Sequence, residues 1–488
     1  MLIGLDAGTS VVKAVAFSDD GEVVRVASRP TTTHVPAPGR TEQDIEEVIA
    51  AAAATLREVA AGETPRIIGI TAQGDGVWLM DAEGKPIRPA ILWSDARAAA
   101  IVEHWMANGV AVRAFRRSGN MLFPGAAAPT LAYLMTEDPA ALAEAATAGY
   151  CKDAIVQRLT GVRATDVSDA SLPFFNHHTL RYDPELLALY GVAECERLLA
   201  PVDPVPGPLR PLSAAGAALT GLPEGVPIHA GPFDLCATTI GAGMDRPGDG
   251  LVIVGTTLGC GVIVDQVETD GAPAGMLLAL HQPNRWVRVM PAMVGTPSLE
   301  WALALTGIPL DGLDAALAAT NPGADGLLCL PLLSPAGERA PFVDPAARGQ
   351  LIGLSLETTG QHILRAVCEG IAYAARHCLD LAGLAPDGAI YMSGGGMKSA
   401  GWRQILADVL GKPLLLARQP EVGARGAAMA ALDAAGIPCD RRAWTLPDGV
   451  IEPDPARARF YDVGYAAYRE RLDSAIGQWS GPRWRQPE

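Results

Sequence analysis

The sequence is poor in positive charge and in aromatic residues. It has 38 Lys and Arg residues against 54 Asp and Glu residues, a formal net charge of −16, and only 5% Phe, Trp and Tyr. Proteins that bind a nucleic-acid backbone depend on clustered Lys and Arg, and the sequence has no such cluster. We therefore expect no nucleic-acid partner, and we expect any anionic ligand to be held by local backbone N–H groups.

Cysteine pairs and long apolar runs are also missing. The eight cysteines include no C-x-x-C pair, which argues against a structural zinc site or a disulfide scaffold and predicts reduced thiols. The opening residues lack a basic segment followed by a long apolar one, and no uncharged apolar run reaches membrane-spanning length. These absences predict a cytoplasmic protein with no membrane partner. The histidines lack metal-ligand spacing, so we interpret them as structural or surface residues.

Two large domains are expected for a chain of 488 residues with 49% hydrophobic residues. We expect them to span 1–245 and 246–488, with the boundary after "TTIGAGMDRPGDG". The proline-dense segment 200–216 is interpreted as a surface connection rather than as that boundary.

Each half begins with strands joined by a turn of Gly and Thr. Residues 1–28 read as three strands, apolar residues at helical spacing follow over 44–60, and "RIIGITAQ" is strand-like. The second half repeats the strand and turn pattern in "GDGLVIVGTTLGCGVIVDQV". Later, "AIYMSGGGMKSAGWRQILADVLGKPLLLA" predicts strand, glycine turn, helix and strand of parallel character, and 454–479 predicts a helix.

The two Gly/Thr turns, "LDAGTS" and "VGTTLG", are candidates for phosphate binding. Their N–H and hydroxyl groups could hold phosphate oxygens, although ordinary hairpin turns have a similar composition. Finding both, each between apolar strands, favours phosphate binding. The candidate residues are Asp6, Gly8, Thr9, Ser10 and Lys13 in the first turn and Gly255, Thr256 and Thr257 in the second.

The segment "SGGGMKS" has three consecutive glycines between a predicted strand and helix. Without side chains, a nucleotide base or ribose could lie close to this backbone. A tight packing turn explains the same residues equally well, and neither common glycine code for nucleotides fits. Both interpretations stay open from the residues alone.

Polar side chains beside tryptophans suggest a sugar site. "AQGDGVWLMD" places Gln73 and Asp75 after a strand, and "LWSDAR" adds Trp93. Sugar hydroxyls need paired donors and acceptors, and sugar C–H faces suit aromatic rings. Asp95 and Arg97, two residues apart in a turn, are interpreted instead as a local brace of the loop.

The carboxylate in "HAGPFDLC", Asp234, follows an apolar strand and precedes a predicted helix. It could cap that helix or face a cleft as a reactive group, and the two roles are compatible. An ordinary carboxylate, with a pKa near ~3.9, would be ionised at neutral pH and could accept a proton without strong activation.

In their order along the chain, these segments resemble the FGGY family of carbohydrate kinases. The resemblance covers nearly the whole chain and includes "GRTEQD", "CKDAIVQRLTG", "TDVSDAS" and "GERAPFVDPAARGQLIGL" beside the segments above. It implies an α/β fold of two actin-like, ribonuclease H-like domains of the actin, Hsp70 and hexokinase superfold, flanking a catalytic cleft that closes around its ligands.

The resemblance also implies roles for individual residues. Asp234 matches the catalytic base, and the two Gly/Thr turns match phosphate loops for ATP. Gly395, Gly396 and Lys398 lie in the adenosine segment. The expected sugar contacts are Gln73, Gly74, Asp75, Trp93, Phe233 and Asp234, and the expected Mg²⁺ residues are Asp6 and Asp234.

The sugar segment departs from the better-known members of this family. Xylulose kinases usually have Met-His after the glutamine and glycerol kinases have Arg-Glu, whereas Gly74 and Asp75 follow Gln73 here. This form resembles the branch with erythritol and L-xylulose-type kinases. We predict phosphorylation of a terminal hydroxyl of a pentulose or of a four- to five-carbon polyol. The alternative function is a non-catalytic, nucleotide-gated protein that senses sugar or forms assemblies. The oligomer that we consider for this protein is a homodimer.

Overall fold

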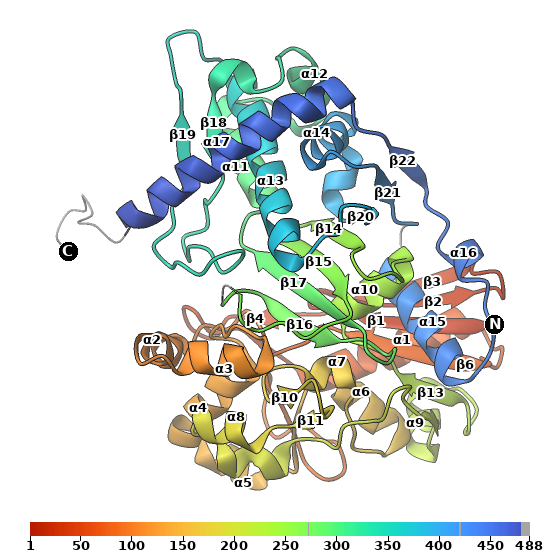
Figure 1. Ribbon diagram of the computed structural model, residues 1–488. Helices are drawn as coiled ribbons and strands as arrows, with labels where there is room; N and C mark the ends of the chain where they lie inside the picture. Colours follow the sequence, from red (N-terminus) through yellow and green to blue (C-terminus); the bar gives the residue numbers. More distant parts are fainter. Residues whose placement is uncertain (272, 419–420, 480–488) are drawn as a thin grey trace. The chain divides into compact units, whose positions relative to one another are not determined.

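The computed structural model describes residues 1–271, 273–418 and 421–479, and Figure 1 shows the course of the chain. The chain forms two compact units. The first unit contains Met1–Asp245, Val264–Val287 and Arg418–Leu446; the second contains Arg246–Ile263, Arg288–Ala417 and the chain from Pro447 onward. The structure thus differs from a single division at residue 245, because two later segments return to the first unit.

The first unit is built on a six-stranded sheet with the order β12-β13-β6-β1-β2-β3. β1 is parallel to β6 and β6 to β13, whereas β1, β2 and β3 form an antiparallel meander. The predicted three strands, helix and strand are present in this order, with two short strands, β4 (Thr33–His34) and β5 (Glu42–Gln43), between the third strand and the helix. The bounds are β1 Leu2–Ala7, β2 Val11–Phe17, β3 Val23–Pro30, α1 Ile45–Ala60, β6 Ile67–Ala72, β12 Leu209–Pro211 and β13 Pro227–Ala230.

Alternating side chains of β1 bury the two faces of this sheet against different helices. Ile3 and Leu5 belong to the apolar core that includes α1, while Leu2 packs with the core of α15 (Val422–Ala434), as expected for side chains that alternate across a strand. α15 lies very close to the strands, since a Cβ on Gly4 would be only 1.9 Å from the carbonyl oxygen of Ala424. This packing is the physical reason why residues 418–446 belong to the first unit.

Shorter elements complete the first unit (Figure 1). The proline-dense segment 200–216 lies inside this unit, so it is not a domain boundary, as predicted. The further strands are β4 Thr33–His34, β5 Glu42–Gln43, β7 Trp78–Met80, β8 Ala90–Ile91, β9 Thr147–Gly149, β10 Phe175–Asn176, β11 Arg181–Tyr182 and β16 Met276–Ala279. The further α-helices are α2 Ala99–Ala107, α3 Val110–Ser118, α4 Ala127–Glu137, α5 Pro139–Glu144, α6 Cys151–Thr160, α7 Val167–Ala170, α8 Pro184–Leu189, α9 Ala214–Thr220, α10 Asp234–Ala242 and α16 Arg441–Trp444.

The second unit contains strands in the order β17-β15-β14-β20-β21-β22. β14 and β15 form the predicted hairpin, and β20 is parallel to both β14 and β21, as the strand, turn, helix and strand pattern predicted. The strands are β14 Gly250–Val254, β15 Leu258–Val264, β17 Trp286–Ala292, β18 Leu328–Leu330, β19 Gln350–Ile352, β20 Ile390–Ser393, β21 Leu414–Leu416 and β22 Gly449–Ile451. The helices are α11 Thr296–Thr306, α12 Leu313–Ala318, α13 Gly360–Ala382, η4 Gly395–Lys398, α14 Ala400–Leu410 and α17 Pro455–Trp479, the last being the predicted C-terminal helix.

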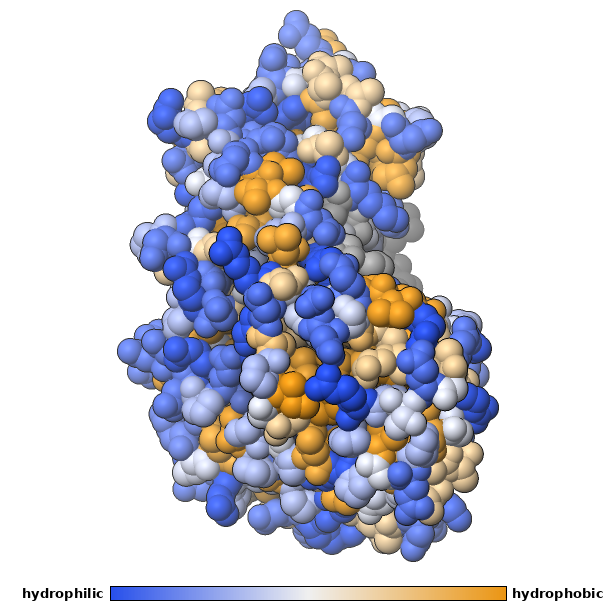
Figure 2. All heavy atoms as spheres, turned by 90° about the vertical axis from the view of Figure 1, so that its right-hand side faces the viewer, coloured by the Kyte–Doolittle hydropathy of each residue, from blue (hydrophilic) through white to orange (hydrophobic). Residues whose placement is uncertain are grey.

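The molecular surface is mainly polar where Figure 2 displays it. Apolar residues on that face form small, separate patches among hydrophilic ones. Among the residues that the structure describes, no helix is both long enough and apolar enough to cross a membrane. All eight cysteines are free, and all but Cys439 are buried, in agreement with the predicted reduced thiols.

Candidate active site

Three parallel strands of the first unit end at the same edge of the sheet. Asp6 lies near the end of β1, opposite Thr71 of β6, and Ile70 of β6 pairs with Ala230 at the end of β13. The segments that follow β6 and β13 carry Asp75 and Asp234. In α/β sheets, ligands bind beyond the carboxyl ends of such strands. The topology therefore brings together three carboxylates that are far apart in the sequence.

The first Gly/Thr turn joins β1 to β2 beside Asp6. The Gly8 N–H donates to the carbonyl of Val11 at 3.1 Å, and Lys13, which pairs in register with Asp6, reaches a carboxylate oxygen of Glu421 at 3.3 Å. Burial raises the pKa of Asp6 to about 6, although the positive charge of Lys13 opposes this shift. Asp6 is thus a half-buried carboxylate with a nearby cation.

Thr9 connects this turn to the predicted sugar segment through a closed set of hydrogen bonds. Its hydroxyl donates to Gln73 Oε1 at 2.7 Å and accepts from Trp93 Nε1 at 3.1 Å. Gln73 Nε2 donates to Gln43 Oε1 at 2.8 Å, and Gln43 Nε2 donates to the Thr9 carbonyl at 2.9 Å. The Thr9 hydroxyl and the Gln73 amide are therefore engaged in holding the site together. No role was predicted for Gln43, although it lies in the family segment "GRTEQD".

The predicted sugar segment has an unusual local geometry. Asp75 is 4% exposed and has a φ of 55°, a value that non-glycine residues rarely adopt. Gly74 lies against the ring of Phe233, so that a Cβ at Gly74 would be 2.0 Å from Phe233 Cε2. Phe233 thus fills the space that a side chain at position 74 would need.

Asp95 and Arg97 brace the neighbouring loop, as their spacing predicted. Asp95 Oδ1 accepts from both the backbone N–H and Nε of Arg97 at 2.8 Å. Asp95 Oδ2 accepts from the Thr41 N–H at 2.6 Å, and Arg97 also donates to Glu42. The histidine interpretation agrees with the structure as well, since His177 is buried against Phe175 and His178 is exposed.

Asp234 is the first residue of α10, and Phe233 occupies the N-cap position. The cap has no side-chain hydrogen bond, so the interpretation of Asp234 as the N-cap residue is wrong. The turn before the helix is anchored from two sides. Thr71 Oγ1 donates to the Pro232 carbonyl at 2.5 Å, and the Phe233 N–H donates to Ser168 Oγ at 2.8 Å.

The environment of Asp234 is electrostatically unfavourable to its charge. Burial raises the pKa of Asp234 well above its ordinary value, the carboxylate of Asp6 raises it further, and a hydrogen bond from the Leu235 N–H opposes both. The carboxylates of Asp169 and Asp75 add smaller upward contributions to this pKa. The expectation of an ordinary pKa for Asp234 does not agree with this environment, because the sequence showed neither the removal of this carboxylate from water nor the strand topology that places Asp6 near it.

A buried charge network lies behind this turn, and no site residue was predicted there. Lys152 is 0% exposed and forms ion pairs with Asp166 and, at 2.6 Å, with Asp169. Burial alone would lower the pKa of Lys152, but the Asp166 and Asp169 carboxylates raise it above its ordinary value. The signal in the sequence was the pair of segments "CKDAIVQRLTG" and "TDVSDAS", which place one Lys and several Asp residues near apolar runs.

In the second unit, the second Gly/Thr turn and the glycine segment also follow parallel strands. Gly255–Thr257 follow β14, and Gly394–Lys398 follow β20, its parallel neighbour. The two segments are close, since a Cβ on Gly394 would be 2.6 Å from the carbonyl oxygen of Val254. Thr296 N–H donates to the Gly255 carbonyl at 2.8 Å and anchors the turn to the start of α11.

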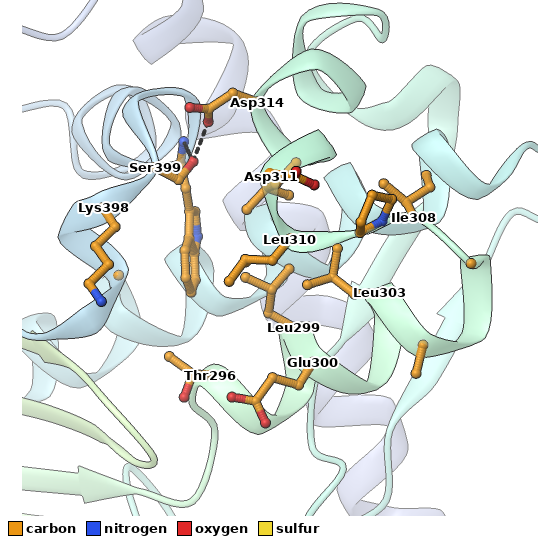
Figure 3. Close-up of a pocket in the computed structure, with 16 residues that line it drawn as sticks. Thr296, Leu299, Glu300, Leu303, Ile308, Leu310, Asp311, Asp314, Lys398 and Ser399 are labelled. Carbon is orange, nitrogen blue, oxygen red and sulfur yellow. Dashed lines mark hydrogen bonds between the residues drawn. The ribbon is translucent and has the colours of Figure 1, made fainter.

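A pocket of about 830 Å³ opens beside this glycine segment (Figure 3). Leu299, Leu303 and Leu310 lie on one side of the pocket, and Lys398 and Ser399 lie on the other. The volume is within the range of pockets that hold small organic ligands. The apolar leucines beside a backbone rich in glycine suit a flat heterocycle.

Asp314 lines this pocket and holds the segment that begins α14 in place. It accepts a hydrogen bond from the Ser399 hydroxyl, drawn in Figure 3, and another from the Gly401 N–H at 3.1 Å. Its carboxylate therefore lies at the positive N-terminus of α14.

Solved structures of sugar kinases have the same fold and identify the class of protein. The structure of xylulose kinase from Rhodospirillum rubrum is 32% identical, with a TM-score of 0.90 over 98% of this chain and 100% of that chain. The fold class prediction is confirmed: the protein is an α/β carbohydrate kinase.

The chain belongs to the FGGY family of carbohydrate kinases. The model of the N-terminal domain of this family matches residues 1–241, and that of the C-terminal domain matches residues 252–435. Relatives include an erythritol kinase from Brucella abortus, 33% identical over 98% of this chain and 97% of its own length. Another is a xylulose kinase from Escherichia coli, 31% identical over 97% of both chains.

These findings confirm the predicted family and the predicted class of enzyme, a phosphotransferase with an alcohol group as acceptor. They do not favour the alternative of a non-catalytic sensing or assembling protein. Kinases of this family use ATP as the phosphate donor.

Proposed function

We propose that this protein transfers the γ-phosphate of ATP to a terminal hydroxyl of a four- to five-carbon polyol or of a pentulose. The observation that carries the proposal is the placement of Asp234 beside Asp6 and Asp75 at the carboxyl edge of one sheet. The names of the relatives, erythritol kinase and xylulose kinase, support this range of acceptors. The buried carboxylate of Asp75 favours vicinal hydroxyls over a carbonyl group, because a carboxylate accepts hydrogen bonds and donates none.

The acceptor is proposed to bind in the first unit. Asp75 and Asp234 would accept hydrogen bonds from its hydroxyls, and Trp93 and Phe233 would cover its C–H groups. Gln73 would act by fixing Thr9 and Gln43 around the site, since its amide oxygen and nitrogen already bond to these two residues. Gly74 would leave room for the Phe233 ring.

ATP is proposed to bind through backbone groups and the pocket of Figure 3. The N–H groups of Thr9 and Ser10, in the turn that Gly8 closes through its bond to Val11, and the turn Gly255, Thr256 and Thr257 would hold phosphate oxygens. Lys13 would add positive charge near the first turn. Gly395, Gly396 and Lys398 would border the adenosine, because the pocket opens beside Gly396 and Lys398.

Mg²⁺ fits the residues at the sheet edge. Asp6 and Asp234 are hard oxygen donors whose mutual repulsion raises the pKa of Asp234, and a cation near both would relieve this repulsion. No cluster of three potential metal-ligating side chains occurs among the described residues, which suits Mg²⁺, since it is usually bound by one or two carboxylates together with phosphates and water. When bound, Mg²⁺ neutralises charge on the transferring phosphoryl group.

In the proposed reaction, the acceptor hydroxyl oxygen forms a bond to the γ-phosphorus as the bond to the bridging oxygen of ADP breaks. The proton of the hydroxyl passes to Asp234 Oδ. The turn before Asp234 is anchored at Pro232 and at Phe233, and this fixed turn would align the carboxylate with the acceptor hydroxyl. The remaining residues bind and orient the two substrates, as phosphoryl transfer requires.

A coupled assay of ADP release over erythritol, D-xylulose, L-xylulose and D-ribulose tests this proposal. We expect at least one of these compounds to raise turnover well above the ATPase background. Isothermal titration with the same panel would rank the acceptors. If none of them raised turnover, the proposed range of acceptors would be wrong.

Asp234→Asn tests the proposed base. We expect ATP binding to persist and kcat to fall by several orders of magnitude, since the amide cannot accept the proton. The variant should also unfold at the same or a higher temperature than the wild type, because it removes a buried charge that Asp6 repels. Near-normal kcat would contradict the assignment, and the thermal midpoint shows that any loss of activity is not a loss of fold.

A further inference from the structure

A line of buried polar contacts leads from Lys152 to the turn that carries Asp234. Lys152 Nζ is paired with Asp166 Oδ1. Asp166 Oδ2 accepts from the Ser168 hydroxyl at 2.6 Å and from the Ser168 N–H at 2.9 Å. Ser168 Oγ in turn accepts from the Phe233 N–H at 2.8 Å. Phe233 directly precedes Asp234.

The direction of each hydrogen bond is fixed by the chemistry of its partners. The ionised Asp166 can only accept, so the Ser168 hydroxyl proton must point toward it. The lone pairs of Ser168 Oγ are thereby left for the Phe233 N–H. The ion pair with Lys152 holds Asp166 in place, and Lys152 and Ser168 are completely buried, where such bonds have no competition from water.

We propose that Ser168 is a positioning residue for the base Asp234. This inference rests on the proposed function, because it assigns Ser168 an effect on proton transfer rather than on folding alone. Phe233 is the N-cap of α10 and has no side-chain cap of its own, so the hydroxyl of Ser168 supplies a partner for the backbone at the point where the helix begins. Loss of the Ser168 hydroxyl would let the turn move, and the Asp234 carboxylate would then move away from the acceptor hydroxyl.

Ser171 provides a matched control one turn further along. Its hydroxyl is equally buried, donates to the Val167 carbonyl at 2.7 Å and accepts from the Ala279 N–H at 2.9 Å. Ser171→Ala therefore also removes one donated and one accepted hydrogen bond, the accepted one from the backbone of a distant segment, without touching the Asp234 turn. Each alanine variant should lower the free energy of unfolding by a similar amount.

The experiment measures kcat, both KM values and the thermal midpoint for the two alanine variants and for Ser168→Thr, with the best acceptor of the panel. For Ser168→Ala we expect kcat to fall by about 10- to 100-fold, the range that a small misplacement of a reacting group produces, with much smaller changes in both KM values. Ser171→Ala should keep its kcat, and Ser168→Thr should recover most of the activity because it keeps the hydroxyl.

A double variant separates positioning from a general structural effect. In an Asp234→Asn background, Ser168→Ala should lower kcat no further, since the group that it positions is already absent. The inference would be overturned if Ser168→Ala kept kcat within about twofold of the wild type, if Ser171→Ala lost as much kcat, or if the two losses in the double variant multiplied. A wild-type protein that phosphorylates no acceptor of the panel would overturn the proposed function first and this inference with it.

Discussion

At the scale of single residues, the contact between Gly74 and Phe233 links the proposed sugar segment to the turn of the proposed base, Asp234. Position 74 has an ordinary backbone conformation for any residue, because its φ is not among the positive values. A steric clash excludes a side chain at position 74, since a Cβ there would be 2.0 Å from the Phe233 ring. Any residue with a side chain at this position therefore requires a different position for Phe233 and for the neighbouring backbone.

Gly74→Ala tests this link. We predict that it lowers stability by about 1–3 kcal/mol, the usual cost of overpacking, and that it lowers kcat/KM for the acceptor because the Phe233 ring must shift. Thermal unfolding and steady-state kinetics measure the two effects. In a double-mutant cycle with Phe233→Ala, the losses should be less than additive, because the clash disappears with the ring.

Gly449→Ala in β22 is the control for this substitution. Its Cβ would meet only an ordinary contact, at 3.7 Å from Leu416 Cδ1. A loss in Gly74→Ala no larger than in Gly449→Ala, or strict additivity in the cycle, would show that Phe233 does not determine the residue at position 74.

At the scale of elements, the connection between β17 and α11 in the second unit depends on a buried carboxylate. Glu338 is 3% exposed, and its Oε1 accepts from the N–H groups of Met293 at 2.7 Å and of Arg339 at 2.9 Å. Burial raises the pKa of Glu338 to about 7, against these hydrogen bonds. This connection also leads to Thr296, which anchors the second Gly/Thr turn.

The raised pKa of Glu338 predicts a pH dependence of stability. Because the folded state binds the proton more tightly than the unfolded state, the contribution of Glu338 to stability is complete below the ordinary pKa and is lost as pH rises toward 7. Glu338→Gln mimics the protonated form. Its stability relative to the wild type should therefore increase by about 2 kcal/mol between pH 5 and pH 8.

Thermal midpoints of both proteins at pH 5 and pH 8 measure this difference. Glu470→Gln, at an exposed position on α17, removes the same formal charge and is the control for the change in net charge. A Glu338→Gln difference that stays constant between the two pH values would contradict the raised pKa.

The elements themselves were largely predictable from the sequence, but their partners were not. Apolar runs bounded by turns and the helical spacing over 44–60 identified β1, β2, β3, α1 and β6, because these patterns are local. The assignment of α15 to the first unit depends on close approach to Gly4 and Gly69, a long-range contact that local patterns do not record. The same applies to Ser168 and Phe233, which lie 65 residues apart.

At the scale of the whole molecule, the proposed binding sites lie in different units. The acceptor residues and the base are in the first unit, and the pocket beside Lys398 is in the second. We therefore predict that the two units close around both substrates during transfer, which would also exclude water from the γ-phosphate.

Small-angle X-ray scattering tests this closure. We predict that the radius of gyration falls when the preferred acceptor and a non-hydrolysable ATP analogue are added together. The control is the same analogue with a panel compound that is not phosphorylated, which should produce a smaller change. Identical scattering curves with and without both ligands would rule out the predicted movement.

The return of α15 to the first unit has a consequence for the order in which the protein folds during synthesis. The sheet of the first unit is complete in sequence once β13 has been made, yet one of its faces stays uncovered until residues 422–434 emerge. Leu2 and Ile67 of that face would meanwhile be exposed to solvent and to other chains. The ribosome thus synthesises α15, the last layer of the first unit, only after most of the second unit. The nascent chain therefore has an incomplete N-terminal core until late in its synthesis.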